Sequence, residues 1–203
     1  ANMDLGRLAP EKASYIMIVC DQILNGELDE NFPLVVYQTG SGTQTNMNVN
    51  EVIAGRAKEM AGVAVLHPND DVNMSQSSND TFPTAMSIAS VFVLEDRVLP
   101  ALNTMIVTLK SLEAKYMKVI KTGRTHLQDA VPMTFGQEIS GWRSMLEHDY
   151  DNILKSLDGL REIALGGTAV GTGLNAPGGF AERAAEALTS LTKKEFITAP
   201  NKF

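Results

Sequence analysis

Hydrophobic residues recur at helical spacing over two long segments of the 203-residue chain. From Val98 to Val119, apolar residues lie three or four positions apart, which is typical of a helix packed in a bundle. A second run of this kind starts at Phe135 and continues to Ala164. Because a helix of ~30 residues is ~45 Å long, these segments predict a mainly α fold built as a bundle of long helices.

Shorter segments complete this pattern. The amphipathic residues from Pro10 to Leu24 predict a helix that starts near Pro10, and residues 181–192 predict another. Residues 34–37 are a short apolar run, which is either a strand or an extended entry to the polar residues that follow. Pro83 and Pro100 lie within helical patterns. Each predicts a helix start or a bend, since proline inside a helix costs ~3 kcal/mol.

Four polar or glycine-rich stretches interrupt the periodic segments: residues 38–50, 67–80, 123–129 and 166–179. The first three are rich in hydroxyl and amide side chains, and we expect each to be a loop that enters a helix. The N–H groups at a helix N-terminus are unpaired and carry the positive end of the helix dipole. Such loops suit a small carboxylate, although capping residues without any ligand produce the same pattern.

The fourth stretch is dense in glycine but lacks the spacing of a dinucleotide-binding fingerprint. We expect no strand before it and no βαβ unit around it. The stretch therefore predicts a helix-to-helix connection in which backbones pack closely.

Charge and composition narrow the possible functions. The chain has 17 Lys and Arg against 24 Asp and Glu, a net charge of −7, which argues against binding to nucleic acid or to an anionic membrane. No run of 18 apolar residues is present, so we expect no transmembrane helix. Cys20 is the single cysteine, which excludes an internal disulfide framework and a cysteine-rich zinc site. His67 with the nearby aspartates matches no common zinc spacing, so we expect no metal.

Among titratable residues, His126 is the best candidate for acid/base catalysis, because a free imidazole titrates near pH 6.5. A hydrogen-bonded structural histidine is the alternative. His148 lies in a long helical segment and is expected to be solvated or charge-paired. Arg124 either clamps a carboxylate through two hydrogen bonds or pairs with Asp129, and the sequence leaves both open.

Five motifs in order give the chain a specific resemblance. They are residues 38–48 (QTGSGTQTNMN), 67–73 (HPNDDVN), 75–80 (SQSSND), 123–129 (GRTHLQD) and 166–173 (GGTAVGTG). With these motifs the chain resembles the class II fumarases of the fumarase/aspartase superfamily. The resemblance implies a mainly helical N-terminal domain at residues 1–78 and an incomplete central long-helix domain at residues 79–203.

The resemblance also implies an activity, the reversible hydration of fumarate to (S)-malate in the tricarboxylic acid cycle, without metal or organic cofactor. The implied partners are a small dicarboxylate and further copies of the chain, which form a homotetramer with composite active sites. No binding to nucleic acid or to a membrane is expected. The implied compartment is the cytoplasm, or the mitochondrial matrix in a eukaryote.

The family's substrate-binding positions match Ser41, Gly42, Thr43, Ser77, Ser78, Asn79 and Thr125. Its second, shallower anion site near the entrance matches His67, Pro68, Asn69 and Asp70. By the same carry-over, His126 handles the proton of the hydroxyl or water, and Thr125 and His126 complete the pocket from another subunit. Fixed neutral donors of this kind stabilise the aci-carboxylate formed when a proton is removed beside a carboxylate.

Aspartase is the nearest alternative, and it usually has Gln where this chain has His126, which favours a hydratase over an ammonia-lyase. A structural relative without catalysis is the other alternative. The family's Gly-Ser-Ser-x-Met-Pro-x-Lys loop, with its base serine and its substrate-binding lysine, does not occur in these 203 residues. We therefore expect the isolated chain to be inactive. Residues 61–66 also lack the family's basic residues before His67, which leaves the second anion site without a nearby cation.

Overall fold

The fold is mainly α, as the hydrophobic pattern predicts. The computed structural model describes residues 1–35, 37 and 42–203. It divides into two compact units, one formed by Ala1–Ser87 with Arg161–Phe203 and the other by Ile88–Leu160. The domain boundary near residue 78, which rests on the resemblance, stays a prediction. Among the described residues, none of the helices is long and apolar enough to cross a membrane.

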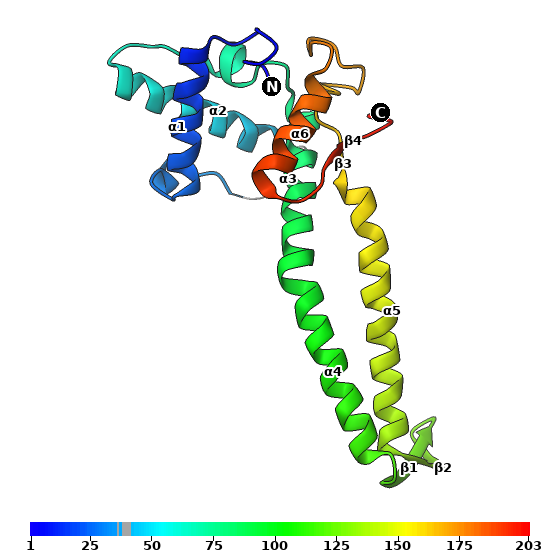
Figure 1. Cartoon of the computed structure of the whole chain (residues 1–203). Coiled ribbons are helices and arrows are strands. Elements are labelled where there is room, and N and C mark those ends of the chain that lie inside the picture. Colours follow the sequence, from blue (N-terminus) through cyan, green and yellow to red (C-terminus); the bar gives the residue numbers. More distant parts are fainter. Residues whose placement is uncertain (36, 38–41) are drawn as a thin grey trace. The chain divides into compact units, whose positions relative to one another are not determined.

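The first unit holds the helices α1, α2 and α6 and the start of α3 (Figure 1). Its elements are α1 (Pro10–Leu24), the 3₁₀ turn η1 (Asp29–Asn31), α2 (Thr43–Ala61), the π-helical turn η2 (Pro68–Val72), α3 (Ser78–Val93), β3 (Glu162–Ile163), α6 (Phe180–Thr192) and β4 (Ile197–Thr198). The predicted helix at Pro10–Leu24 is confirmed, and α6 begins one residue before the predicted position.

The core of this unit lies between α1 and α2. Val19 of α1 and Ala57 of α2 are fully buried, and Ile53, Ala54 and Leu66 pack with them. On both helices the apolar positions follow helical spacing, so each helix buries one stripe. This packing holds the first turn of α2 and the turn η2 in place, and both belong to the candidate site.

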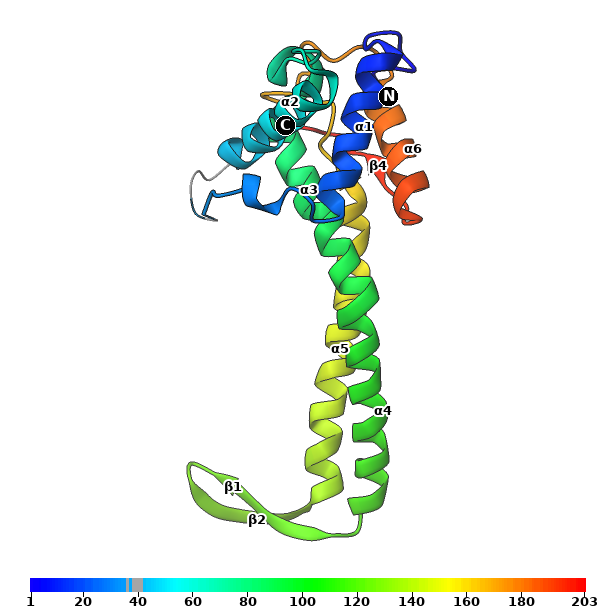
Figure 2. The ribbon, with the colours of Figure 1, turned by 90° about the vertical axis from the view of Figure 1, so that its left-hand side faces the viewer.

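The second unit is a pair of antiparallel helices that ends in a β-hairpin (Figure 2). Its elements are the end of α3, the π-helical turn η3 (Leu94–Val98), α4 (Leu99–Tyr116), β1 (Ile120–Thr125), β2 (Gln128–Thr134) and α5 (Phe135–Arg161). The two predicted long helices correspond to α4 and α5. Arg143 of α5 donates to Glu113 of α4 at 2.6 Å and to Glu147 at 2.5 Å. Both hydrogen bonds raise the pKa of Arg143, and the one to Glu113 has the larger effect.

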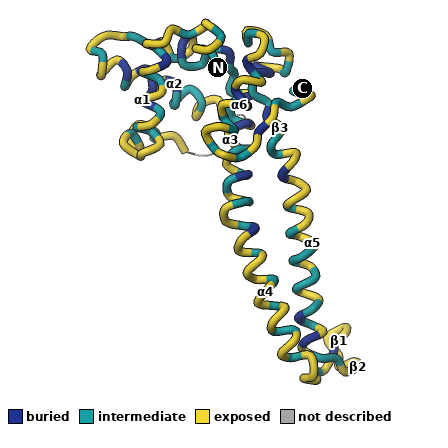
Figure 3. The backbone as a smooth tube through the Cα atoms, viewed as in Figure 1, coloured by how far each residue is buried: buried dark blue, intermediate teal, exposed yellow. Residues whose placement is uncertain are grey.

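Most large apolar residues along α4 and α5 are exposed or only partly buried (Figure 3). Leu99, Ile139 and Leu157 are the buried apolar residues of these two helices. The large exposed ones are Met105, Val107, Phe135, Trp142, Met145 and Leu154. A helix pair buries only the faces that it turns toward itself, so the outer stripes stay accessible to a further apolar surface.

Two predictions about strands were wrong. Residues 123–129 are not a loop entering a helix but the centre of the antiparallel hairpin β1–β2. A strand also precedes the glycine-rich stretch, because β3 pairs in parallel with β4 on the far side of α6, which is a minimal βαβ arrangement. Both strands have only two residues, and the stretch between β3 and α6 still connects two helices as predicted. Residues 34, 35 and 37 belong to neither helix nor strand.

One of the two prolines lies at a helix start, as predicted. Pro100 is in the first turn of α4, directly after the π-helical turn η3. Pro83 instead lies inside α3, five residues after the first residue of that helix. Thr84 follows it and donates its hydroxyl hydrogen to the carbonyl of Asp80 at 2.7 Å.

Candidate functional site

The first unit contains a pocket of about 570 Å³ into which several of the predicted residues point. The predicted site residues that line it are Thr43, Asn69, Asp70, Ser77 and Ser78. The remaining walls come from α2, from residues 73–76 and from the glycine-rich stretch between Thr168 and Asn175. Residues predicted for the substrate site and for the second anion site therefore share one pocket.

Two helices begin at this pocket. Thr43 is the first residue of α2 and Ser78 is the first of α3, and their hydroxyl oxygens lie 3.0 Å apart. Gly42 precedes α2 with φ +71°, and it offers no side chain to cap the helix. A Cβ at Gly42 would lie 2.3 Å from the ring of Phe82, so the packing of Phe82 of α3 against Gly42 requires glycine. This wall therefore combines two hydroxyl groups with the N-terminal ends of two helix dipoles. It carries no formal charge, yet its partial positive charges attract an anion.

The start of α3 is held by a reciprocal cap. Ser77 Oγ accepts from the N–H of Asn79 at 3.2 Å, and Asp80 Oδ1 accepts from the N–H of Ser77 at 2.9 Å. This is a capping box with aspartate in the position of the usual glutamate. The cap turns the Ser77 side chain toward its own helix, while that of Ser78 faces Thr43 across the pocket wall.

Asp80 also fastens the glycine-rich stretch to α3. Its Oδ2 accepts from the N–H of Gly166 at 3.0 Å and from the N–H of Thr168 at 2.7 Å. Asp80 is only 2% exposed, so hydrogen bonds from the protein take the place of water around this carboxylate. One residue earlier, the amide of Asn79 donates to the carbonyl of Ala169 at 2.8 Å. Two adjacent residues thus hold one wall of the pocket against another.

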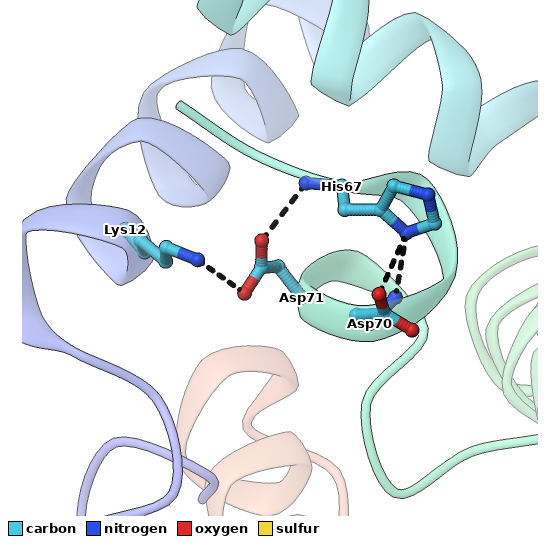
Figure 4. A network of polar contacts seen from close by, with 4 residues as sticks. All are labelled: Lys12, His67, Asp70 and Asp71. Carbon is cyan, nitrogen blue, oxygen red and sulfur yellow. Dashed lines mark hydrogen bonds and ion pairs between the residues drawn. The ribbon is translucent and has the colours of Figure 1, made fainter. Parts of the chain in front are cut away.

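The residues of the predicted second anion site lie in and before η2 (Figure 4). His67 Nδ1 accepts from the N–H of Asp70 at 3.2 Å, and the His67 N–H donates to Asp71 Oδ2 at 2.8 Å. Lys12 of α1 reaches the other oxygen of Asp71 at 2.7 Å. Burial raises the pKa of the Asp71 carboxyl, but the hydrogen bonds from Lys12 and from the His67 N–H, with the Lys12 charge, outweigh burial and hold that pKa below its usual value.

The charges around this turn are unfavourable for an anion. The Lys12 ammonium is paired with Asp71, on the side of the turn away from the imidazole of His67 (Figure 4). Asp70 is the one formally charged residue among the described residues that line the pocket, and its side chain is 82% exposed. His67 and Pro68 are not among the lining residues. The sequence predicts that the second anion site has no cation nearby, and the described residues agree with this prediction because Lys12 is already paired with Asp71.

Thr125 and His126 belong to the second unit and not to the pocket lining. They lie at the end of the hairpin, where Thr125 pairs with Gln128 across a two-residue turn. His126 and Leu127 both have positive φ, 52° and 61°, as a type I′ turn requires. Non-glycine residues in this conformation are strained by roughly 1–2 kcal/mol each. Both side chains are exposed, Leu127 to 96%.

Arg124 and Asp129 form an ion pair at 3.1 Å across the same hairpin. The internal pair is therefore the arrangement that the structure adopts, of the two that the sequence left open. His148 is exposed on α5. Ser41, which was predicted to bind a substrate carboxylate, lies outside the described residues.

Several residues that form the pocket were not predicted as site residues from the sequence, and three of them make polar contacts that shape it. Asn46 and Asn73 line the pocket, and the side chain of Asp80 holds its walls together. A local signal existed only for Asp80, because the sequence from Ser77 to Asp80 fits a capping box. The contacts of Asn46 and Asn73 join distant parts of the chain, and no local pattern announces them.

Comparison with known proteins agrees with the motifs. The whole chain, residues 1–203, matches the profile of a protein family described as Lyase. The chain belongs to this lyase family. It is 56% identical over 207 aligned residues to the class II fumarate hydratase of Helicobacter pylori and 54% identical to that of Bacillus subtilis. In both cases all of this chain is covered but only 45% of the relative, so the chain spans less than half the length of these proteins.

Solved structures give the same result for the fold. The class II fumarase of Schistosoma mansoni superimposes with a TM-score of 0.91 at 46% identity, covering 100% of this chain and 46% of that one. A fumarate lyase:delta crystallin from Brucella melitensis gives a TM-score of 0.88 at 41% identity, covering 99% of this chain and 45% of that one. The resemblance to class II fumarases and the fold class are both confirmed.

Proposed function

We propose that the native-length protein is a fumarate hydratase, which interconverts fumarate and (S)-malate. The observation that carries the proposal is the pocket wall at which the hydroxyls of Thr43 and Ser78 meet between two helix N-termini. It occurs in a chain whose sequence is 56% identical to a class II fumarate hydratase. Uncharged hydroxyl and N–H donors of this kind bind the carboxylates through hydrogen bonds, and no cationic side chain among the described lining residues cancels the charge of the substrate.

The chemistry suits such a wall. Removing the proton next to a carboxylate places additional negative charge on that carboxylate, and fixed donors stabilise this charge more than they stabilise the ground state. Thr43 and Ser78 would hold a carboxylate at this wall. The resemblance also assigns Ser41 and Gly42 to the carboxylate that Thr43 binds, and Ser77 and Asn79 to substrate binding with Ser78, and the roles of these four residues stay predictions. The second anion site at residues 67–70 stays a prediction, and the negative charge of Asp70 argues against it.

The resemblance assigns the proton transfer of the hydration step to a histidine, and no histidine is among the described residues that line this pocket. We propose that Thr125 and His126 reach the pocket of another copy in a homotetramer, where His126 handles the proton of the hydroxyl or water. The exposed, strained turn at His126 supports this role, because strain of this kind concentrates at functional sites. The uncovered apolar residues along α4 and α5 support assembly with further copies. A location in the cytoplasm or mitochondrial matrix stays a prediction.

The proposal is tested with the protein at its native length. (S)-Malate should yield fumarate, measured by ultraviolet absorbance, and light scattering should give four times the mass of one chain. The 203-residue chain of 22.0 kDa alone should show no turnover, because the base-bearing loop is absent. Release of ammonia from aspartate instead would identify an ammonia-lyase. Absence of both reactions would indicate a structural relative.

Two pairs of variants connect the activity to the site. Thr43→Val should raise KM for malate about tenfold, as loss of a hydrogen bond to a charged group does. Thr45→Val, two residues on in the same helix and outside the pocket lining, should leave KM unchanged. His126→Gln should lower kcat by about 100-fold or more, and His148→Gln should not. Equal effects within either pair would contradict the assigned role.

A further inference from the structure

Three asparagine side chains form a hydrogen-bonded network at the pocket, and two of them line it. Asn73 donates through Nδ2 to the carbonyl of Gln76 at 3.3 Å. Its Oδ1 accepts from Nδ2 of Asn46 and from Nδ2 of Asn50, each at 3.1 Å. Asn50 is buried, whereas Asn46 and Asn73 line the pocket.

The contact between Asn73 and the carbonyl of Gln76 fixes the orientation of all three amide groups. A backbone carbonyl only accepts hydrogen bonds, so the NH₂ group of Asn73 must face Gln76. The oxygen of Asn73 then faces α2, and Asn46 and Asn50 must both turn their NH₂ groups toward it. Asn46 is therefore left with its Oδ1 unused, and among the described residues nothing donates to that atom.

The position of Asn46 places this oxygen near the proposed substrate-binding hydroxyls. Asn46 lies one helical turn after Thr43 in α2, so the two side chains share a face of the helix. The hydroxyls of Thr43 and Ser78 can rotate to donate to a carboxylate, whereas an oriented amide oxygen can only accept. A fumarate dianion has no hydrogen to offer such an atom, but the hydroxyl group of malate and the water that adds to fumarate each have one.

We propose that Asn46 Oδ1 accepts the hydrogen bond of the malate hydroxyl, or of the water that adds to fumarate, and that Asn73 orients it for this task. The assignment rests on the proposed function and adds a specificity-determining residue to it. Asn46 would distinguish a hydroxylated dicarboxylate from one that carries carboxylates alone. Asn73 is a positioning residue, since it acts through Asn46.

The test compares two dianions that differ by this hydroxyl. Steady-state kinetics on the native-length protein gives the KI of succinate, an inhibitor that cannot react, and the KM of (S)-malate, and the ratio of the two cancels general damage to the pocket. Asn46→Ala should lower this succinate-to-malate ratio about fivefold, the effect of one neutral hydrogen bond. Asn73→Ala, which leaves Asn46 in place but unoriented, should lower it about twofold to threefold.

Asn48→Ala is the matched control. Asn48 lies in the same helix but donates to the carbonyl of Asn31, outside the pocket lining, so its loss should leave the ratio unchanged. An unchanged ratio in Asn46→Ala, with both ligands still bound, would overturn this inference and leave the proposed function intact. A wild-type protein that binds neither ligand would overturn the proposed function, and this inference with it.

Discussion

Replacing Asp80 with alanine removes the carboxylate that joins the start of α3 to the glycine-rich stretch. In the folded protein this carboxylate accepts N–H groups from Ser77, Gly166 and Thr168, at 2.9, 3.0 and 2.7 Å. Gly166 and Thr168 are buried, so their N–H groups have no ready access to water after the change. The N–H of Ser77 lies nearer the surface and can be solvated.

The expected cost follows from those groups. A buried donor left without an acceptor costs about 1–3 kcal/mol, and two such donors remain. Loss of a negative charge from the first turn of α3 adds about 0.5 kcal/mol through the helix dipole. Release from the desolvation of a buried carboxylate opposes both terms. We therefore expect Asp80→Ala to destabilise the contact between α3 and the stretch by about 3 kcal/mol.

Hydrogen exchange measures this contact locally. A loss of about 3 kcal/mol should speed exchange of the Gly166 and Thr168 amides about 100-fold if they exchange by local opening. Asp80→Asn keeps one accepting oxygen and should give a smaller increase. Asp70→Ala is the control, because that carboxylate is exposed and the change should leave exchange at both amides as in the wild type. Exchange in Asp80→Ala within about twofold of the wild type would refute the reasoning.

Two further changes test the site's scaffold. Gly42→Ala should destabilise the protein by about 2 kcal/mol or more, because the backbone has φ +71° and the new Cβ would overlap the ring of Phe82. Gly55→Ala, in open space on α2, should instead stabilise it by about 0.5–1 kcal/mol; thermal unfolding of the two variants should therefore shift in opposite directions. Lys12→Met should remove part of the stability contributed by Asp71: because the folded pKa of Asp71 is lowered, that contribution is present above its unfolded pKa near 4 and is lost as pH falls through the lower folded value. The difference between wild type and Lys12→Met in a urea titration should therefore be largest near neutral pH and vanish in acid, and a constant difference across pH would contradict this account.

The residues of the candidate site were predictable to different degrees. Thr43 and Ser78 were assigned to substrate binding by the resemblance, whereas the pattern of polar residues before an apolar helical segment predicted only that helices begin near them, and both do begin helices. That they meet at 3.0 Å could not be predicted, since they are 35 positions apart. The role of Asp80 depends on partners 86 and 88 positions away. No local pattern indicates which distant N–H groups bind to Asp80. The capping box that Asp80 forms with Ser77 indicates only where α3 begins.

The hairpin shows why one local prediction failed. Its turn is formed by His126 and Leu127, which do not belong to the Asn-Gly or Asp-Gly pairs that usually adopt positive φ at both positions. Its strands also lack a clean alternation of apolar and polar residues, and Pro132 lies within β2. Without a usual turn pair or a clean alternation in the strands, the local pattern does not predict the hairpin.

The sequence by itself determined the helices, because helical spacing of apolar residues and the chemistry of helix ends act within a few positions of the chain. Pro10–Leu24, α4 and α5 are the clearest examples. The tertiary structure alone decided which helix ends meet. It also decided which carboxylate receives the N–H groups of a distant loop and which amides meet at Asn73. Those contacts join residues tens of positions apart, and their energy depends on burial, which arises only once the chain has folded.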